Sequence, residues 1–183
     1  MRAKRFRLWK GVATALTIAT VAVIVYLVMG TVSQRRAAFR AMMCFSNAKR
    51  IGLAICVYAQ DNDGYLPNAN HLPSRDGSPA LPTVIARYVR PEDRDEDIYR
   101  CPVDRGGHFK REGLSYNYGF GFLDVGQPPQ RQEAPFGRHP GTVPILSDFD
   151  FHRIVQRKIV LWADGHVKRL ARENLEDYML REP

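Results

Sequence analysis

The chain has 183 residues and a formal net charge of +8, with 27 basic residues, 19 acidic residues and three cysteines. Five of the basic residues precede an uncharged run that begins at Gly11, and the balance beyond them is close to neutral, which argues against nucleic-acid binding. About 150 residues follow that run, enough for one modest domain and too few for a second.

The uncharged run from Gly11 to Gln34 predicts a transmembrane helix. At a rise of about 1.5 Å per residue it is long enough to cross the hydrocarbon core of a bilayer. The basic residues before it predict that residues 1–10 are cytoplasmic and that residues 35–183 form an exported domain. Arg35 and Arg36 put positive charge beyond the run as well, but the amino-terminal side carries more of it.

Two other interpretations of this run stay open. A cleaved signal peptide would share the basic start, although Val28-Met29-Gly30-Thr31 only loosely imitates a cleavage site. A buried core helix is the second alternative, but the residues from Ala19 to Met29 are apolar on nearly every face, whereas a globular helix normally keeps a polar stripe.

The helical pattern continues beyond the apolar run and predicts an amphipathic helix in the exported domain. Small or apolar residues recur there at spacings of three and four: Ala38, Met42, Phe45, Ala48, Gly52, Ile55 and Ala59. The helix is expected to end at the cluster Asp61-Asn62-Asp63-Gly64. A single helix of about 50 residues would then join the membrane span to the exported domain.

Three segments of mixed character follow this helix. The composition predicts a loop from Pro67 to Pro82, a short helix from Thr83 to Val89 and an acidic loop from Pro91 to Asp97.

The second half of the chain changes to the periodicity of strands. Alternating aromatic residues predict one strand with a single aromatic face, formed by Tyr116, Tyr118, Phe120 and Phe122. Further elements are expected in chain order: a loop from Val125 to Pro140, strands at Val143–Phe149 and Lys158–Ala163, a turn at Asp164-Gly165, a strand at His166–Leu170 and a helix at Arg172–Leu180. The predicted fold class is therefore α+β, a long amino-terminal helix that covers a small antiparallel sheet.

The three cysteines would lie in an oxidising compartment, where disulfides form. Cys44 and Cys56 cannot pair on one helix, because they would be roughly 18 Å apart, beyond the limit of about 7 Å. Cys44–Cys101 and Cys56–Cys101 remain as possible bridges. We take Cys44 and Cys101 as the candidate pair, which would tie the helix to the loop before the sheet, with two unrelated buried thiols as the alternative.

Four blocks of the sequence resemble bacterial pilin-like proteins of the type II secretion pseudopilin and type IV pilin kind. They are CFSNAKRIGLAICVYAQDNDGYLP (residues 44–67), YRCP (99–102), SYNYGFG (115–121) and VLWADGHVKRL (160–170). The carboxyl-terminal block is similar to a planctomycete-type set that has a histidine before an Asp-Gly-His-Val hairpin. The resemblance implies an inner-membrane helix whose exposed half packs against a periplasmic sheet.

One position departs from the pattern of these proteins. Lys10-Gly11 aligns with the prepilin processing site, but Leu16 stands where assembling pilins carry a glutamate at the fifth mature position. An unpaired carboxylate in hydrocarbon would be costly, and in such pilins it is thought to neutralise a neighbouring subunit's terminal amine. The run has no carboxylate to perform that task.

Two candidate ligand sites have structural alternatives beside them. Asp61, Asp63 and Asp164 are candidate calcium ligands, because Ca²⁺ takes several carboxylate oxygens and the resemblance implies calcium binding in the sheet domain. Turn formation is the simpler account of these residues, since no complete EF-hand pattern is present. Tyr116 and Tyr118 could form a platform for a sugar or a base, and packing in the core is the alternative.

Two hypotheses for function follow. The first is a non-enzymatic, single-pass inner-membrane protein that acts through contacts with other pilin-like subunits or a secretion platform. The second is a membrane-tethered periplasmic module that binds a ligand or a cation and does not polymerise. An anchored hydrolase lacks a nucleophile motif, and a zinc site lacks paired Cys or His ligands.

Overall fold

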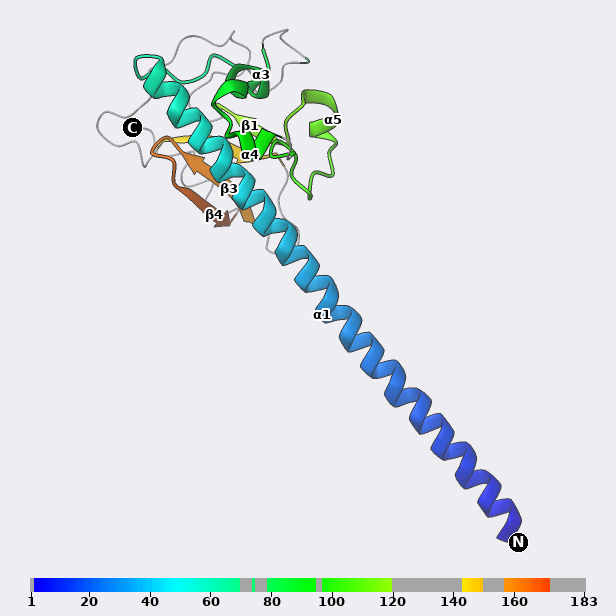
Figure 1. The fold of residues 1–183 in the computed structure, drawn as a ribbon. Helices are drawn as coiled ribbons and strands as arrows, with labels where there is room; N and C mark the ends of the chain where they lie inside the picture. Colours follow the sequence, from blue (N-terminus) through cyan, green and yellow to red (C-terminus); the bar gives the residue numbers. More distant parts are fainter. Residues whose placement is uncertain are drawn as a thin grey trace. The chain divides into compact units, whose positions relative to one another are not determined.

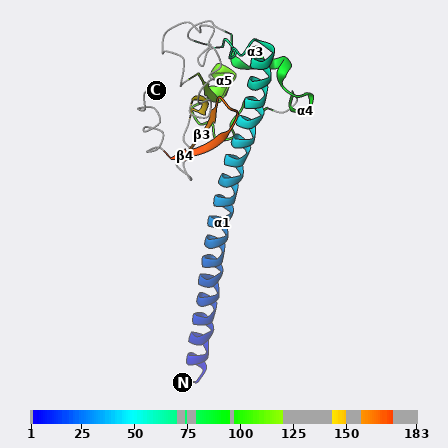
Figure 2. The same ribbon diagram turned by 90° about the vertical axis from the view of Figure 1, so that its left-hand side faces the viewer.

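The computed structural model describes residues 2–69, 74, 79–94, 97–119, 143–149 and 157–171 (Figures 1 and 2). The chain divides into two units, Met1–Phe39 and Arg40–Pro183. Helix α1 (Arg2–Asp61) continues without a break through both of them.

The described part of the first unit is entirely helical. Its side chains are exposed throughout residues 14–34, so these residues are not the buried core helix that was one alternative. Among the described residues, α1 is the one helix long and apolar enough to cross a membrane. The hydroxyl groups of Thr17 and Thr31 donate to the carbonyls of Thr14 and Val28 at 2.8 Å. Such bonds satisfy polar groups within the helix, as a hydrocarbon environment requires.

The second unit contains a four-stranded antiparallel sheet in the order β1-β2-β3-β4. The strands are β1 (Tyr116–Tyr118), β2 (Pro144–Asp148), β3 (Arg157–Trp162) and β4 (Val167–Ala171). The α+β class and the antiparallel sheet are therefore confirmed. Phe120, Phe122 and the predicted Val125–Pro140 loop and Arg172–Leu180 helix lie outside the described residues.

The turn between β3 and β4 has the predicted hairpin character. Gly165 has a φ of +85°, and its N–H donates to the carbonyl of Trp162 at 2.9 Å. The N–H of Trp162 donates to the carbonyl of His166 at 3.0 Å, which closes the hairpin. Glycine suits this position because left-handed backbone carries little steric penalty without a Cβ.

The second half of α1 packs against the sheet. In Figures 1 and 2 it runs alongside β3 and β4, and Gly52 lies directly against the buried side chain of Leu161. The buried residues of this part of α1 are Ala41, Cys44, Asn47, Ala48, Ile51, Gly52, Ala54, Ile55 and Ala59. Ala38 and Met42 are exposed, so the predicted apolar stripe is wrong at its start: the buried face begins at Ala41, three positions after Ala38.

Short helices make up the connection between α1 and the sheet: α3 (Leu81–Ile85), the 3₁₀ turn η1 (Ala86–Tyr88), α4 (Pro91–Arg94) and α5 (His108–Glu112). The first two confirm the predicted Thr83–Val89 helix with an earlier start. The prediction of a loop throughout Pro91–Asp97 is wrong, because Pro91 begins a helical turn with Glu92 and Asp93 in it. Proline at the first helical position and acidic residues in the first turn both favour helix formation.

Candidate functional site

A disulfide joins α1 to the segment before α5. Cys44 and Cys101 are bonded, with their Cα atoms 5.1 Å apart and a sequence separation of 57. Cys44 is fully buried and Cys101 is nearly so. Of the two possible bridges, the structure contains Cys44–Cys101, and it leaves Cys56 as a free thiol.

Two hydrogen bonds reinforce this connection. The side-chain amide of Asn47 donates to the carbonyl of Arg100 at 3.1 Å, one residue before Cys101. The hydroxyl of Tyr116 on β1 donates to the carbonyl of Cys44 at 3.4 Å. Helix, loop and first strand therefore meet at the disulfide, and the loop at residues 97–104 is fixed against α1 by covalent and polar contacts.

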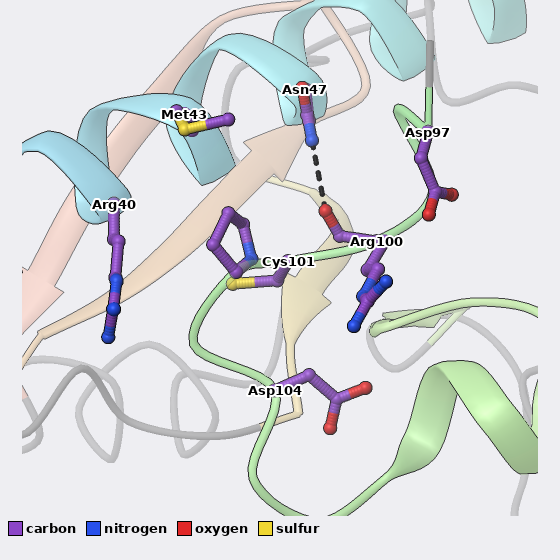
Figure 3. Close-up of a pocket in the computed structure, with 8 residues that line it drawn as sticks. Arg40, Met43, Asn47, Asp97, Arg100, Cys101 and Asp104 are labelled. Carbon is purple, nitrogen blue, oxygen red and sulfur yellow. Dashed lines mark hydrogen bonds between the residues drawn. The ribbon is translucent and has the colours of Figure 1, made fainter. Parts of the chain in front are cut away.

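A hollow of about 690 Å³ opens between α1 and this loop (Figure 3). Its lining consists of Arg40, Met43, Asn47, Asp97, Arg100, Cys101, Pro102 and Asp104. The volume is within the range of about 300–1,000 Å³ that is typical of ligand pockets. We call it the disulfide hollow.

Asp104 has its carboxylate engaged by the protein itself. One oxygen accepts the N–H of His108 at 3.1 Å, and the other accepts the N–H of Phe109 at 2.7 Å and the hydroxyl of Ser115 at 2.8 Å. Partial burial alone would raise the pKa of Asp104, but these hydrogen bonds outweigh it and hold the pKa below its usual value. Asp104 therefore caps α5 and stays ionised at neutral pH.

The two arginines of the disulfide hollow are in a different situation. Within the described part of the chain, neither Arg40 nor Arg100 forms an ion pair with a carboxylate. The guanidinium of Arg100 lies over the ring of Phe109, 5.8 Å from its centre. Arg40 is exposed on α1, one helical turn before Cys44. Figure 3 places these two side chains on either side of Cys101.

Tyr116 and Tyr118 are core residues, and the interpretation of them as a ligand platform is wrong for this structure. Both side chains are completely buried. The hydroxyl of Tyr118 donates to the carbonyl of Pro67 at 2.8 Å. Burial raises the pKa of both phenols well above their usual value. No face of either ring is open to a sugar or a base, because the sheet places both of them toward α1.

The three candidate calcium ligands are not assembled into one site. Among the described residues, no group of three or more His, Cys, Asp or Glu side chains is arranged to hold a metal ion. Asp61 is the last residue of α1, and Asp63 has a φ of +55° in the turn that follows. Asp164 lies in the β3–β4 hairpin. Turn formation accounts for all three positions.

Asp164 is bonded to His166 within its own turn. Its carboxylate accepts the backbone N–H of His166 at 3.0 Å and also contacts the imidazole Nδ1. The imidazole stacks on the indole of Trp162, with ring centres 4.5 Å apart. Burial of Asp164 acts to raise its pKa, but the bonds from His166 prevail and lower it. These contacts stabilise the hairpin.

Cys56 lies beside the same hairpin without the features of a reactive thiol. A Cβ at Gly165 would be 3.5 Å from its sulfur atom. Burial and then the charge of Asp164 raise the pKa of the thiol. A raised pKa lowers the thiolate fraction at neutral pH, so Cys56 is a poor nucleophile.

Large apolar side chains also remain exposed on α1 in the second unit. Met42 is 61% exposed, Met43 42%, Leu53 41% and Val57 36%. Met42, Leu53 and Val57 lie away from the buried stripe, and we call these three residues the outer face of α1. Isolated exposed apolar residues are common, and apolar residues that share one side of a helix offer contact area to another protein.

Sequence reasoning identified the disulfide but missed the disulfide hollow. Asp104 precedes Gly106 and Gly107 and the start of α5, and an acidic residue shortly before a helix is a recognisable capping signal. Asn47 and Arg40 give no such signal. Their role depends on which face of α1 meets the loop, and that is fixed by contacts distant in the sequence, the Cys44–Cys101 bridge among them.

Comparison with known proteins identified no relative of the chain. No protein-family model, no curated protein and no solved structure matches the chain.

Proposed function

We propose that this chain is a non-enzymatic, pilin-like inner-membrane protein that acts as a structural or assembly component of a type II secretion or pilus-type system. The observation that carries the proposal is the double use of α1 (Arg2–Asp61). Its first part is an exposed apolar helix long enough for one membrane span, and its last part is the spine against which the sheet packs. The sequence resemblance at residues 44–67 and 160–170 supports the same proposal.

The basic residues before the apolar run favour a cytoplasmic amino terminus and a periplasmic second unit. The disulfide supports this orientation, since disulfides form and persist mainly in oxidising compartments. Contacts with other subunits would then involve the apolar span and the outer face of α1.

Leu16 determines how such contacts could form. The side chain is 60% exposed and carries no charge, in the place where assembling pilins have a glutamate. Association within the membrane must therefore depend on packing of apolar side chains rather than on pairing of a carboxylate with an amine.

The test is site-directed crosslinking in intact membranes. With a photoreactive residue at Val23, the full-length protein should crosslink to other pilin-like subunits or to a secretion platform. Ala19→Arg should abolish these crosslinks, because a charge in the middle of the span disrupts apolar packing. A matched control is Lys49→Arg, which keeps the charge and lies outside the span. Absence of any crosslinked protein in the wild type would contradict the proposal.

A second candidate function is a membrane-tethered periplasmic module that binds a ligand and does not polymerise. The disulfide hollow favours it, because that volume is suited to a ligand and its walls are fixed by a covalent bond. It would be supported if the full-length protein in detergent remained monomeric and melted at higher temperature in the presence of a ligand.

A further inference from the structure

We propose that the disulfide hollow binds a carboxylate side chain of an extended acidic peptide segment from a partner protein. The inference stands on the geometry of the hollow and does not require that the chain assembles into a pilus-type structure.

The first step of the argument is that the hollow is preformed. One wall is α1 at Arg40, Met43 and Asn47, and the opposite wall is the loop at residues 97–104. The Cys44–Cys101 bond and the bond from Asn47 to the carbonyl of Arg100 hold these walls together. A site whose walls are already fixed loses little conformational entropy when a ligand binds.

The second step concerns which charges of the hollow are free to bind a ligand. Two carboxylates and two guanidinium groups line it. Asp104 is occupied by three hydrogen bonds to His108, Phe109 and Ser115, so its oxygens are directed into the protein. Arg40 and Arg100 form no ion pair with any carboxylate in the described residues. The available strong donors are therefore the two guanidinium groups, whose forked geometry matches a carboxylate.

The third step is the choice between a free anion and a peptide. Met43 is 42% exposed and Pro102 is also exposed, and both line the hollow together with the two arginines. Asp97 is also exposed at the rim. Apolar surface and a carboxylate acceptor would hinder a small multiply charged anion. A peptide suits them, because its side chains can pack on Met43 and its backbone N–H groups can donate to Asp97.

The experiment measures binding of a fluorescent, acetylated pentaglutamate peptide to the full-length protein in neutral detergent micelles at an ionic strength of about 0.15 M. Fluorescence anisotropy should show saturable binding, and a pentaglutamine peptide of the same length should not bind. Arg40→Gln should weaken binding by about tenfold, since a hydrogen bond to a charged group contributes about that much. Arg157→Gln, which removes the same charge from β3 outside the hollow, should change the affinity less than about twofold at moderate salt.

Two results would overturn the proposal. The first is the absence of pentaglutamate binding, and binding of citrate in its place would assign the hollow to a small anion. The second is equal affinity in the wild type and the Arg40→Gln variant. Arg100→Gln serves as a second variant from the opposite wall, and the intrinsic fluorescence of buried Trp162 verifies that each variant is folded.

Discussion

At the scale of single residues, hydrogen bonds determine in which direction the pKa values of acidic groups in the second unit are shifted. Asp104 is partly buried and Asp164 is exposed, yet both have lowered pKa values, because the hydrogen bonds that their carboxylates accept outweigh the effect of burial. Tyr99 shows the opposite case. Burial without such compensation raises its pKa to about 12.

Replacing Asp104 by asparagine should lower the free energy of unfolding of the second unit by about 1 kcal/mol at pH 7, because the negative charge at the start of α5 and one of two accepting oxygens are lost. The folded-state pKa of Asp104 is lowered, so its contribution is fully present above the ordinary aspartate value of about 3.9 and is lost as the pH falls through the folded-state pKa. Between pH 5 and pH 2 the free energy of unfolding should therefore fall less in the variant than in the wild type, by roughly 1 kcal/mol. Thermal unfolding followed by Trp162 fluorescence at several pH values measures this difference. A parallel acid response in both proteins would contradict the assignment.

The cysteines give a second prediction at this scale. Mass spectrometry of the denatured protein after alkylation should show one modified thiol without reductant, at Cys56, and three after reduction. The double variant Cys44→Ser, Cys101→Ser should reduce the free energy of unfolding by about 2–4 kcal/mol. Cys56→Ser is the control, and it should leave the disulfide intact. Alkylation of all three thiols in unreduced protein would refute the bridge.

At the scale of elements, the sequence predicted the strands and the end of α1 more accurately than the connections. The β3–β4 hairpin was found because Asp164-Gly165 is a strong local turn signal between two apolar runs. The turn at α4 and the short helix α5 were missed because helices of four or five residues have too few positions to show a period.

The buried face of α1 was predicted only in part, for a physical reason. Phe45 and Met42 are apolar and fit the helical spacing, yet Met42 is exposed and Asn47 is buried. Asn47 can be buried because its amide donates to the carbonyl of Arg100. A hydropathy pattern cannot predict this hydrogen bond, because the accepting carbonyl is 53 residues away in the sequence.

Gly52 gives a prediction about the contact between α1 and β3. An added Cβ would lie 2.6 Å from one methyl carbon of Leu161 and 3.1 Å from the other. Leu161 is fully buried and cannot move without disturbing its neighbours. Gly52→Ala should therefore destabilise the second unit by about 1–2 kcal/mol, since the overpacking outweighs the better helix propensity of alanine.

The matched control for this prediction is Gly30→Ala. A Cβ there meets nothing within 4 Å, so the substitution should leave the melting temperature of the second unit unchanged. Comparison of the two variants by Trp162 fluorescence separates packing from helix propensity. If the Gly52→Ala protein were at least as stable as the wild type, the side chain of Leu161 would be able to move and accept the added methyl group.

At the scale of the whole molecule, α1 leads to a prediction about membrane attachment. The full-length protein should remain in the membrane fraction after an alkaline carbonate wash and enter solution only with detergent, because residues 14–34 are exposed, uncharged and mostly apolar. A chain without residues 2–34, exported behind a cleavable signal, should be released by the wash. The intact mass of the membrane-bound protein decides between a retained anchor and a cleaved signal peptide.

The sequence predicted the type of architecture, a long apolar amino-terminal helix and a unit of helix and antiparallel sheet, whereas compartment and function stay predictions. A span and a helix–sheet unit follow from hydropathy and periodicity, which are local properties. The disulfide hollow depends on two segments more than 50 residues apart, and its chemistry depends on the bonds that occupy Asp104 while leaving Arg40 unpaired among the described residues.

The Cys44–Cys101 bridge has one more consequence, for how the chain responds to a protease. The bond closes a ring that contains the last turns of α1, the connecting segment with α3 and α4, and the loop at residues 97–100. A single cut anywhere inside this ring leaves the two fragments joined. A protein nicked inside this ring would therefore keep its full mass on a gel without reductant, and its sheet would stay covalently attached to the amino-terminal part of α1. After such a cut, only reduction would release the second half of the chain.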